Sequence, residues 1–237
     1  MILLIVLTAL GRYLFLAGSA YLICYKPGLR VLNKYKIQPK PPKEKQVKNE
    51  LLYSLSTICI FSLVGIMVYL LYINGMTTIY LDISEYGLLY FILSIIIMIV
   101  LHDIYFYFTH RLLHTPWMLR NIHVVHHRSV NPTPLAAYCF HPVEAIIETL
   151  LVFPFVTVLP LNLYAFLIFT FFVLMMNVMG HLGFEFFSQR FRCSRFGKLF
   201  TTSTHHNLHH RKVNKNFGYY FTWCDRLFKT MHKDTFK

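Results

Sequence analysis

The amino-acid sequence predicts an all-α integral membrane protein with about four transmembrane helices and a helical cap on one side of the bilayer. Three observations support this prediction: long apolar runs, an uneven distribution of basic residues, and histidines that recur at helical spacing. The chain has 237 residues, of which 56% are hydrophobic, and its mean hydropathy is positive. Its apolar residues are concentrated in runs of about 20, the length that crosses a bilayer as a helix.

Four apolar regions follow one another along the chain. Arg12 interrupts the first region, which lacks the basic start and the cleavage site of a signal peptide and is expected to span or to lie partly in the interface. Pro154 and Pro160 interrupt the last region, which is therefore expected to form a hairpin of two segments. The four regions are residues 1–25, 51–73, 86–108 and 143–180.

The net charge of +13 is concentrated in two stretches. Residues 26–50 contain eight Lys or Arg and two Glu, and residues 188–237 contain eleven Lys or Arg and two Asp. The connection 74–85 has no Lys or Arg. By the positive-inside rule, both basic stretches face the cytoplasm and residues 74–85 face away. The basic excess indicates topology and attraction to anionic lipid head groups, and nucleic acid is not an expected partner.

These patterns divide the chain into two regions. Residues 1–108 are expected to form an N-terminal transmembrane region with a basic cytoplasmic loop at 26–50. Residues 109–237 are expected to contain the histidine clusters, the transmembrane hairpin 143–180 and a cytoplasmic C-terminal part. The five cysteines show no paired spacing, so no disulfide bond is expected and a reducing cytoplasmic face is compatible.

Histidine is the most informative residue type, because nine of the 13 histidines fall into three clusters. The clusters read HRLLH, HVVHH and HHNLHH. Steps of three and four residues keep side chains on one face of a helix, so each cluster forms a short row of imidazoles. The clusters contain His110 and His114; His123, His126 and His127; and His206, His209 and His210, with His205 as a further candidate.

Metal binding is the preferred interpretation of these clusters. A single histidine is more often a surface or core residue, but two of the clusters share the spacing H-x-x-H-H. Imidazole suits iron, zinc, copper and nickel, so the ligand type does not select the metal. Eight or more rings exceed the roughly four that a single zinc ion takes, which predicts two ions. Because the predicted topology brings every cluster to the cytoplasmic side, the cap is expected to hold a dimetal site.

Three neighbouring residues carry weaker signals. Asp103 lies on the same helical stripe as His110 and His114 and could hold a metal-bound histidine through its second nitrogen, bond Tyr107, or remain a helix-end carboxylate near Arg111. Two histidines lie outside the clusters. His141 follows a proline-rich loop and could be a ligand, a support for a ligand, or a contact at the start of a helix; His181 ends an apolar helix at the level of the clusters and is a candidate ligand.

The order of these motifs resembles the fatty acid hydroxylase / sterol desaturase superfamily. The resemblance covers residues 103–230 and is carried by HRLLH, HVVHH, PTPLAAYCFHPVE, NVMGHLG, and HHNLHH followed by NFGYYFTWCDRLFKT. The part from HRLLH to HPVE looks most like the sterol C5-desaturase (lathosterol oxidase) branch. This resemblance implies a non-haem di-iron centre in a four-helix membrane base with a cytoplasmic cap, and O₂-dependent desaturation or hydroxylation of a lipid.

The resemblance also implies a set of ligands and partners. The two iron ions would be replaced by zinc in some purified preparations. The lipid substrate would come from the bilayer, and electrons from a separate donor, either a cytochrome b5-like protein or a ferredoxin, which the basic side chains of Arg190, Arg192, Arg195 and Lys198 could dock. The implied ligands are His110, His114, His123, His126, His127, His206, His209 and His210, with His181 as the additional one.

Other functions are weighed against this reading. The main alternative is hydroxylation of an alkylglycerol, a fatty acyl chain or a carotenoid, because both outcomes begin with the same hydrogen abstraction. A transition-metal transporter is a remote alternative, since it would need ligands along the spans, and a catalytically dead lipid-binding relative is disfavoured because the ligand set is complete. The membrane would be the plasma membrane in a bacterium or the endoplasmic reticulum in a eukaryote.

Overall fold

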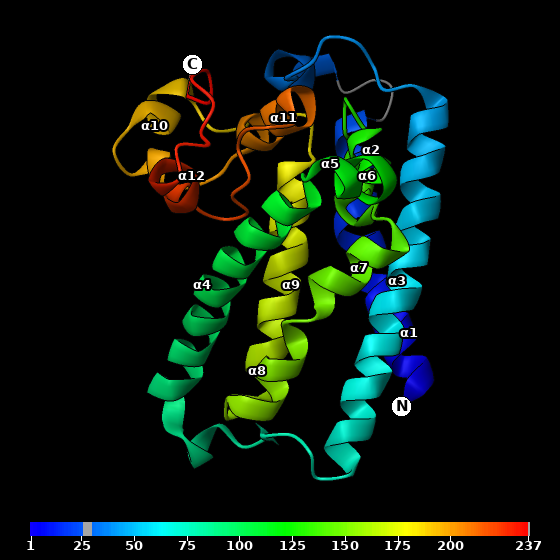
Figure 1. Cartoon of the computed structure of the whole chain (residues 1–237), viewed down its shortest axis with the longest axis vertical. Coiled ribbons are helices and arrows are strands. Elements are labelled where there is room, and N and C mark those ends of the chain that lie inside the picture. The colour runs from blue at the N-terminus through cyan, green and yellow to red at the C-terminus, as the bar shows by residue number, and fades with distance from the viewer. Residues whose placement is uncertain (26–29, 237) are drawn as a thin grey trace.

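The computed structural model describes residues 1–25 and 30–236, so residues 26–29 of the expected basic loop lie outside the described part. Within that part the chain is mainly helical, as Figure 1 shows, and strands are limited to one short pair. Four helical segments are long and apolar enough to cross a membrane, which confirms the expectation of about four transmembrane helices. They are Ile2–Tyr25, Glu44–Ile73, Gly87–Leu113 and Leu163–Gly180.

The long helices begin and end where local chemistry requires it. Helix α3 (Glu44–Ile73) has Glu44 in its first turn, where a carboxylate favours the helix dipole. It ends at Asn74, and Gly75 follows with a φ of +67°, a left-handed conformation that only glycine adopts readily. Helix α9 (Leu163–Gly180) starts at Asn162, whose side chain accepts a hydrogen bond from the backbone N–H of Tyr164, as a good N-cap does.

The region 143–180 differs in detail from the expected hairpin. Its first limb consists of two short helices, α7 (Pro142–Thr149) and α8 (Val152–Val158), and the break between them falls at residues 150–151. Pro154 lies in the first turn of α8, where its missing N–H costs no intrahelical hydrogen bond. Pro160 does separate α8 from α9.

A short parallel pair of strands closes the end of the bundle opposite to the histidines. Strand β1 (Ile79–Tyr80) pairs with β2 (Leu161–Asn162), Ile79 opposite Leu161. Figure 1 shows this end at the bottom, where the connection from α3 to α4 (Gly87–Leu113) runs beneath α8. The connection 74–85, which carries no basic residue, therefore lies far from the basic segments.

Two buried apolar clusters hold the helices together, and many large apolar side chains on the outside remain exposed. One cluster joins α4, α8 and α9 through Met98, Phe155 and Phe169. The other joins α1 (Ile2–Tyr13), α3 and α9. Exposed Leu63 and Leu89 are typical of the outer helix faces. Monomeric soluble proteins rarely expose so large an apolar surface, which indicates contact with lipid.

A buried polar network fixes the loop that precedes α7. The carboxylate of Glu50 accepts hydrogen bonds from Thr133 Oγ1 (2.5 Å) and Gln46 Nε2 (2.7 Å). The hydroxyl groups of Tyr13 and Ser54 both donate to the carbonyl oxygen of Leu135, at 2.9 and 2.8 Å. Because buried polar groups are costly when unpaired, this complete set of bonds favours one loop conformation. The loop leads into Cys139, which contacts a histidine of the site.

The histidine-bearing segments meet at one end of the bundle. They are the C-terminal ends of α4 and α9, the turn from α5 (Pro116–Met118) to α6 (Val124–His127), and α11 (Ser203–Lys212). The basic segment after residue 30 lies at the same end (Figure 1), where Lys36 pairs with Phe184 and Gln38 Nε2 donates to Asn207. The remaining short helices, α10 (Gln189–Cys193) and α12 (Trp223–Leu227), lie beside this end.

Candidate metal centre

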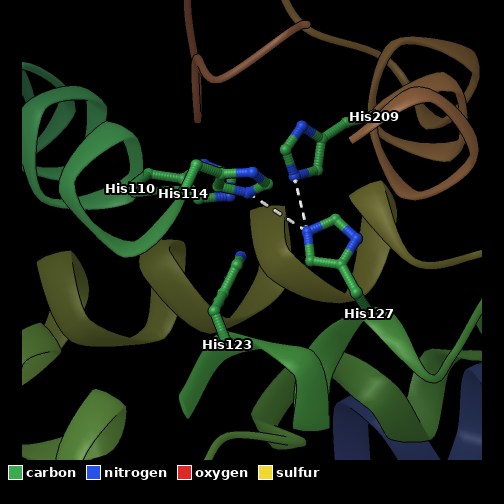
Figure 2. A group of neighbouring side chains, drawn as sticks. All are labelled: His110, His114, His123, His127 and His209. Atoms are coloured by element: carbon green, nitrogen blue, oxygen red, sulfur yellow. Dashed lines mark hydrogen bonds between the residues drawn. The ribbon is translucent and has the colours of Figure 1, made fainter. Parts of the chain in front are cut away.

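The structure brings nine of the predicted histidines into two adjacent groups. Within each group, one nitrogen from every ring lies within 4.8 Å of the others. Figure 2 shows the rings of the first group, here called group one, which come from the end of α4, the turn before α6, α6 itself and α11. Group one contains His110, His114, His123, His127 and His209, and group two contains His126, His181, His206 and His210.

The groups do not coincide with the sequence clusters. His123 and His127 are four residues apart and join group one, whereas His126 between them joins group two. In α11 the division is reversed, because His206 and His210 join group two and His209 joins group one. Residues i and i+4 lie nearly above one another on a helix, whereas residue i+3 is rotated by about 100° from residue i+4. Each H-x-x-H-H motif therefore supplies both groups.

Hydrogen bonds at the second ring nitrogen orient the rings. The Nδ1 atoms of His110 and His209 lie 3.1 and 2.7 Å from the carbonyl oxygens of Phe217 and Lys215. A carbonyl only accepts, so in each ring Nδ1 carries the hydrogen and Nε2 keeps its lone pair. Nε2 of His110 is buried and has no hydrogen-bond partner among the described residues. This arrangement is the one that metal-bound histidines adopt.

The pair His126 and His181 provides the clearest indication of a cation. Both rings direct Nδ1 at a backbone carbonyl, of Cys139 at 3.3 Å and Asn177 at 2.8 Å. Both Nε2 atoms therefore carry lone pairs, yet they lie 3.3 Å apart. Two lone pairs at that distance repel each other unless a cation lies between them. A metal–nitrogen distance of about 2.0–2.1 Å places neighbouring ligand nitrogens roughly 3.0–3.4 Å apart, so the residues fit a metal ion.

Similar separations recur across both groups. In group two, Nε2 of His206 lies 2.9 Å from that of His181 and 3.0 Å from that of His210. In group one, Nε2 of His127 lies 3.2 Å from that of His114 and 3.1 Å from that of His209, as the dashed lines in Figure 2 show. The nitrogens are therefore already spaced as ligands of a common ion.

Burial keeps the rings neutral. It lowers the pKa of His181 and of His209 to about 4. Burial and then the neighbouring rings hold the pKa values of His127, His206 and His210 well below the usual value for histidine. Neutral imidazole is the form that ligates metals. These five rings are thus in the neutral form that binds a metal ion at neutral pH.

One supporting residue escaped the analysis of the sequence. Glu144 on α7 is buried, and its Oε1 accepts a 2.7 Å hydrogen bond from Nδ1 of His123. A carboxylate behind a metal-bound histidine fixes the orientation of the ring and increases its basicity. A signal was present, because a carboxylate three residues after His141 opens an otherwise apolar segment, where an acidic residue is expected to be functional.

The candidate residues with weaker signals have other partners. His205 directs Nε2 at Asp225 (3.1 Å) and lies outside both groups. His141 caps α7, its Nδ1 accepting a hydrogen bond from the backbone N–H of Val143, which is the helix-start role considered above. Asp103 accepts hydrogen bonds from the backbone N–H groups of Tyr220 (2.7 Å) and Phe221. It ties α4 to the segment after α11 rather than holding one of the nine rings.

Asp225 fastens the same segment from the other side. Its carboxylate accepts hydrogen bonds from the backbone N–H groups of Phe217 and Gly218, each at 2.9 Å. Burial alone would raise the pKa of Asp225, but the hydrogen bonds from His205 and its other partners hold it at about 2. The ionised carboxylate thereby positions Phe217, whose carbonyl oxygen orients His110.

The fold and the site define a membrane-embedded protein with a histidine-rich candidate dimetal centre at one end of its helices. The family model for fatty acid hydroxylase matches residues 95–230, and the chain belongs to this family. This result confirms the resemblance found in the sequence. The matched residues include both histidine groups.

Individual relatives are sterol desaturases. Rat lathosterol oxidase is 30% identical over 238 residues, covering 94% of this chain and 73% of the relative. Delta(7)-sterol 5(6)-desaturase ERG3B of Gibberella zeae is 30% identical over 180 residues, covering 76% of this chain and 54% of the relative, so the match spans about half of that protein. Human lathosterol oxidase is 30% identical over 187 residues, 77% of this chain and 60% of the relative. No solved structure matches the chain.

Proposed function

We propose that this protein is a membrane-bound, O₂-dependent di-iron oxidoreductase that desaturates a sterol-type lipid. The observation that carries the proposal is the pair of adjacent groups of five and four neutral imidazoles at one end of a lipid-facing bundle. The relatives named as sterol desaturases and lathosterol oxidases support desaturation of a sterol over other lipid chemistry. Hydroxylation of a lipid is the alternative outcome at the same site.

The nine histidines would hold the two metal ions. Two iron ions, when bound, supply the reduction of O₂ and the removal of hydrogen from an unactivated C–H bond. The protein fixes five of the nine rings through Nδ1 and limits the access of water by burying the site. Zinc also accepts imidazole ligands, so zinc in a purified preparation is compatible with a working iron enzyme.

A small cavity lies where both groups meet the interior of the bundle. Its volume is about 10 Å³, close to the space that one water molecule requires. Both groups contribute to its wall, with His110 and His123 from one and His126, His181 and His206 from the other, together with Phe106, Phe140 and Asn177. The cavity marks the side of the metal centre that a substrate from the bilayer would approach.

The proposed reaction also needs electrons, and the given residues contain no dinucleotide, haem or iron–sulfur motif. A cytochrome b5-like protein or a ferredoxin would supply them. Arg190 and Lys198 lie on and near α10, beside the histidine-bearing end. Their positive charge suits an acidic donor by electrostatic complementarity.

The distribution of charge supports a cytoplasmic site. The described part of the basic stretch 26–50 and the basic C-terminal stretch both lie at the histidine-bearing end of the bundle, and the connection to α4, which has no Lys or Arg, lies at the other. By the positive-inside rule, this distribution supports a metal centre at the cytoplasmic face. A boundary near residue 108 would divide an N-terminal membrane region from the histidine-bearing region. Because the histidines gather at one end, transport of a metal along the spans is not proposed.

Lipid analysis tests the proposed function. Cells that lack sterol C5-desaturation would be supplied with a Δ7-sterol and an electron donor, and would express the protein, its His126→Ala variant or its His209→Ala variant. Wild type is expected to form the 5,6-unsaturated sterol only in the presence of O₂, and each variant to lose the product and the iron ion of its own histidine group. Absence of any O₂-dependent change in any lipid class would contradict the proposal, as would full activity and iron content in both variants.

A further inference from the structure

Two carboxyl groups on α7 face the cavity at the candidate metal centre. Glu144 and Glu148 are one helical turn apart, and both belong to the cavity wall with rings from the two histidine groups. Residues four apart share one helix face. Glu144 uses only Oε1, on His123. The cavity wall is therefore acidic on the side of α7 and imidazole-rich on the other.

Neither carboxyl group is fully hydrogen-bonded. Oε2 of Glu144 is buried without a partner, and the residue is 1% exposed. Among the residues that the structure describes, Glu148 makes no hydrogen bond. Arg and Lys are also missing from the residues that line the cavity. A buried carboxyl oxygen without a partner is costly, so Oε2 of Glu144 is expected to receive its partner from a molecule in the cavity, which the half-buried Glu148 also lines.

The size of the cavity indicates what that partner is. About 10 Å³ accommodates a single oxygen-sized group. A water molecule and the hydroxyl group of a lipid both meet this limit, and both donate a hydrogen bond to a carboxyl oxygen. A hydrocarbon segment of a fatty acyl chain has no donor to offer.

We propose that Glu148, together with the free Oε2 of Glu144, binds the hydroxyl group of the lipid substrate and so selects hydroxylated, sterol-type lipids over plain acyl chains. The proposal rests on the proposed function and identifies the residues that recognise the substrate. In a 3-hydroxysterol only one carbon separates carbon 3 from carbon 5. A hydroxyl group in this cavity therefore brings carbons 5 and 6 close to the histidine groups that share its wall. Phe106 and Phe140 line the same cavity and would contact the apolar rings.

Equilibrium binding to the full chain tests this assignment without turnover. The protein would be loaded with redox-inert zinc in lipid nanodiscs and titrated with radiolabelled cholesterol and with its 3-deoxy analogue. A site that hydrogen-bonds a substrate hydroxyl rejects the analogue that lacks it, so wild type is expected to prefer cholesterol by about 100-fold or more. Glu148→Leu is expected to reduce this preference to roughly threefold while it retains binding of the 3-deoxy analogue, which shows that the variant is folded.

Two further variants sharpen the result. Glu148→Gln still offers an acceptor and is expected to keep most of the preference. Glu85→Gln, an exposed glutamate at the opposite end of the bundle, is the matched control and is expected to behave like wild type.

The outcomes separate the assignment from the proposed function. Equal binding of both sterols to wild type, or an unchanged preference in Glu148→Leu, would show that the cavity holds only water, and the assignment would be wrong even if lipid desaturation persists. Failure of wild type to bind either sterol, together with no O₂-dependent lipid product, would overturn the proposed function as well.

Discussion

At the scale of single residues, the protein orients the candidate ligands through the ring nitrogen that points away from the ion. Backbone carbonyl oxygens accept the Nδ1 hydrogen bonds of four rings, and a carboxylate accepts that of His123. The four rings are those of His110, His126, His181 and His209. A carbonyl acceptor fixes the tautomer without adding charge, whereas a carboxylate also increases the basicity of the ring. His123 is therefore expected to be the most electron-rich ligand of group one.

Glu144→Ala tests this orientation. The change removes the acceptor at Nδ1 of His123 and is expected to weaken metal binding by about 10- to 100-fold, the usual cost of losing such a partner. Glu144→Gln keeps a neutral acceptor and should lose less. Competition against a metal chelator of known affinity measures the change. An affinity equal to that of wild type in Glu144→Ala would show that the hydrogen bond does not support the site.

Asp225 predicts a specific pH dependence of stability. Because hydrogen bonds hold its pKa at about 2, below the usual 3.8, the ionised carboxylate stabilises the fold above about pH 4. This stabilisation is lost as the pH falls through 2. A shift of nearly two pKa units corresponds to roughly 2 kcal/mol. Asp225→Asn is therefore expected to lower the free energy of unfolding by about that amount at pH 7.

The same comparison at low pH completes the test. The difference between wild type and Asp225→Asn should narrow as the pH is lowered from 4 towards 2, because wild type then loses its charge too. Chemical unfolding in detergent, followed by circular dichroism, measures both curves. If the difference in the free energy of unfolding stays constant from pH 4 to pH 2, the substitution acts through side-chain packing and not through the charge of Asp225.

At the scale of elements, α6 and α11 each supply ligands to both groups. His206 belongs to group two and His209 to group one, although they are three residues apart. The single helix α11 therefore couples the positions of the two candidate ions. Movement of this helix would alter both groups together.

Separate substitutions in α11 are expected to remove different ions. His206→Ala should lose the ion of group two and His209→Ala that of group one, leaving roughly one of two ions in each case. The double variant should lose both. Metal analysis combined with cobalt absorption spectra, which differ between four- and five-ligand sites, distinguishes the two single variants. Identical spectra and metal contents in the two variants would contradict the division into groups.

The helices and the histidine clusters could be predicted from the sequence because apolar length and three- or four-residue steps are local properties. The assignment of each ring to a group could not, since it depends on how α6 and α11 face each other. The acceptors Phe217 and Lys215 lie in a loop and are main-chain atoms, so no residue type marks them. The break after Thr149 has no adjacent proline or glycine to indicate it. The role of Glu144, in contrast, could have been predicted from an acidic residue at the start of an apolar segment.

At the scale of the whole molecule, an apolar outer surface surrounds a polar end. The histidine groups, the described basic segments and the short helices α10 and α12 all lie at or beside that end, and the β1–β2 pair lies at the other. A substrate dissolved in the bilayer can therefore approach the centre without crossing water. Under the proposed function, a donor protein would approach from the aqueous side, where Arg190 and Lys198 lie on and near α10.

Chemical labelling tests the orientation in the membrane. Cys193 is exposed at the end of α10, and Ser84→Cys would place a thiol in the exposed connection at the opposite end. In sealed cells, a membrane-impermeant maleimide is expected to label Ser84→Cys and to reach Cys193 only after permeabilisation. The reverse pattern would place the metal centre on the outer face.

The central claim is that nine histidines from distant segments hold two metal ions. Iron content together with Mössbauer spectroscopy of the anaerobically loaded protein tests this claim most directly. The account predicts about two iron ions per chain, in two sites ligated mainly by nitrogen. A single site, or ligation mainly by oxygen or sulfur, would contradict it.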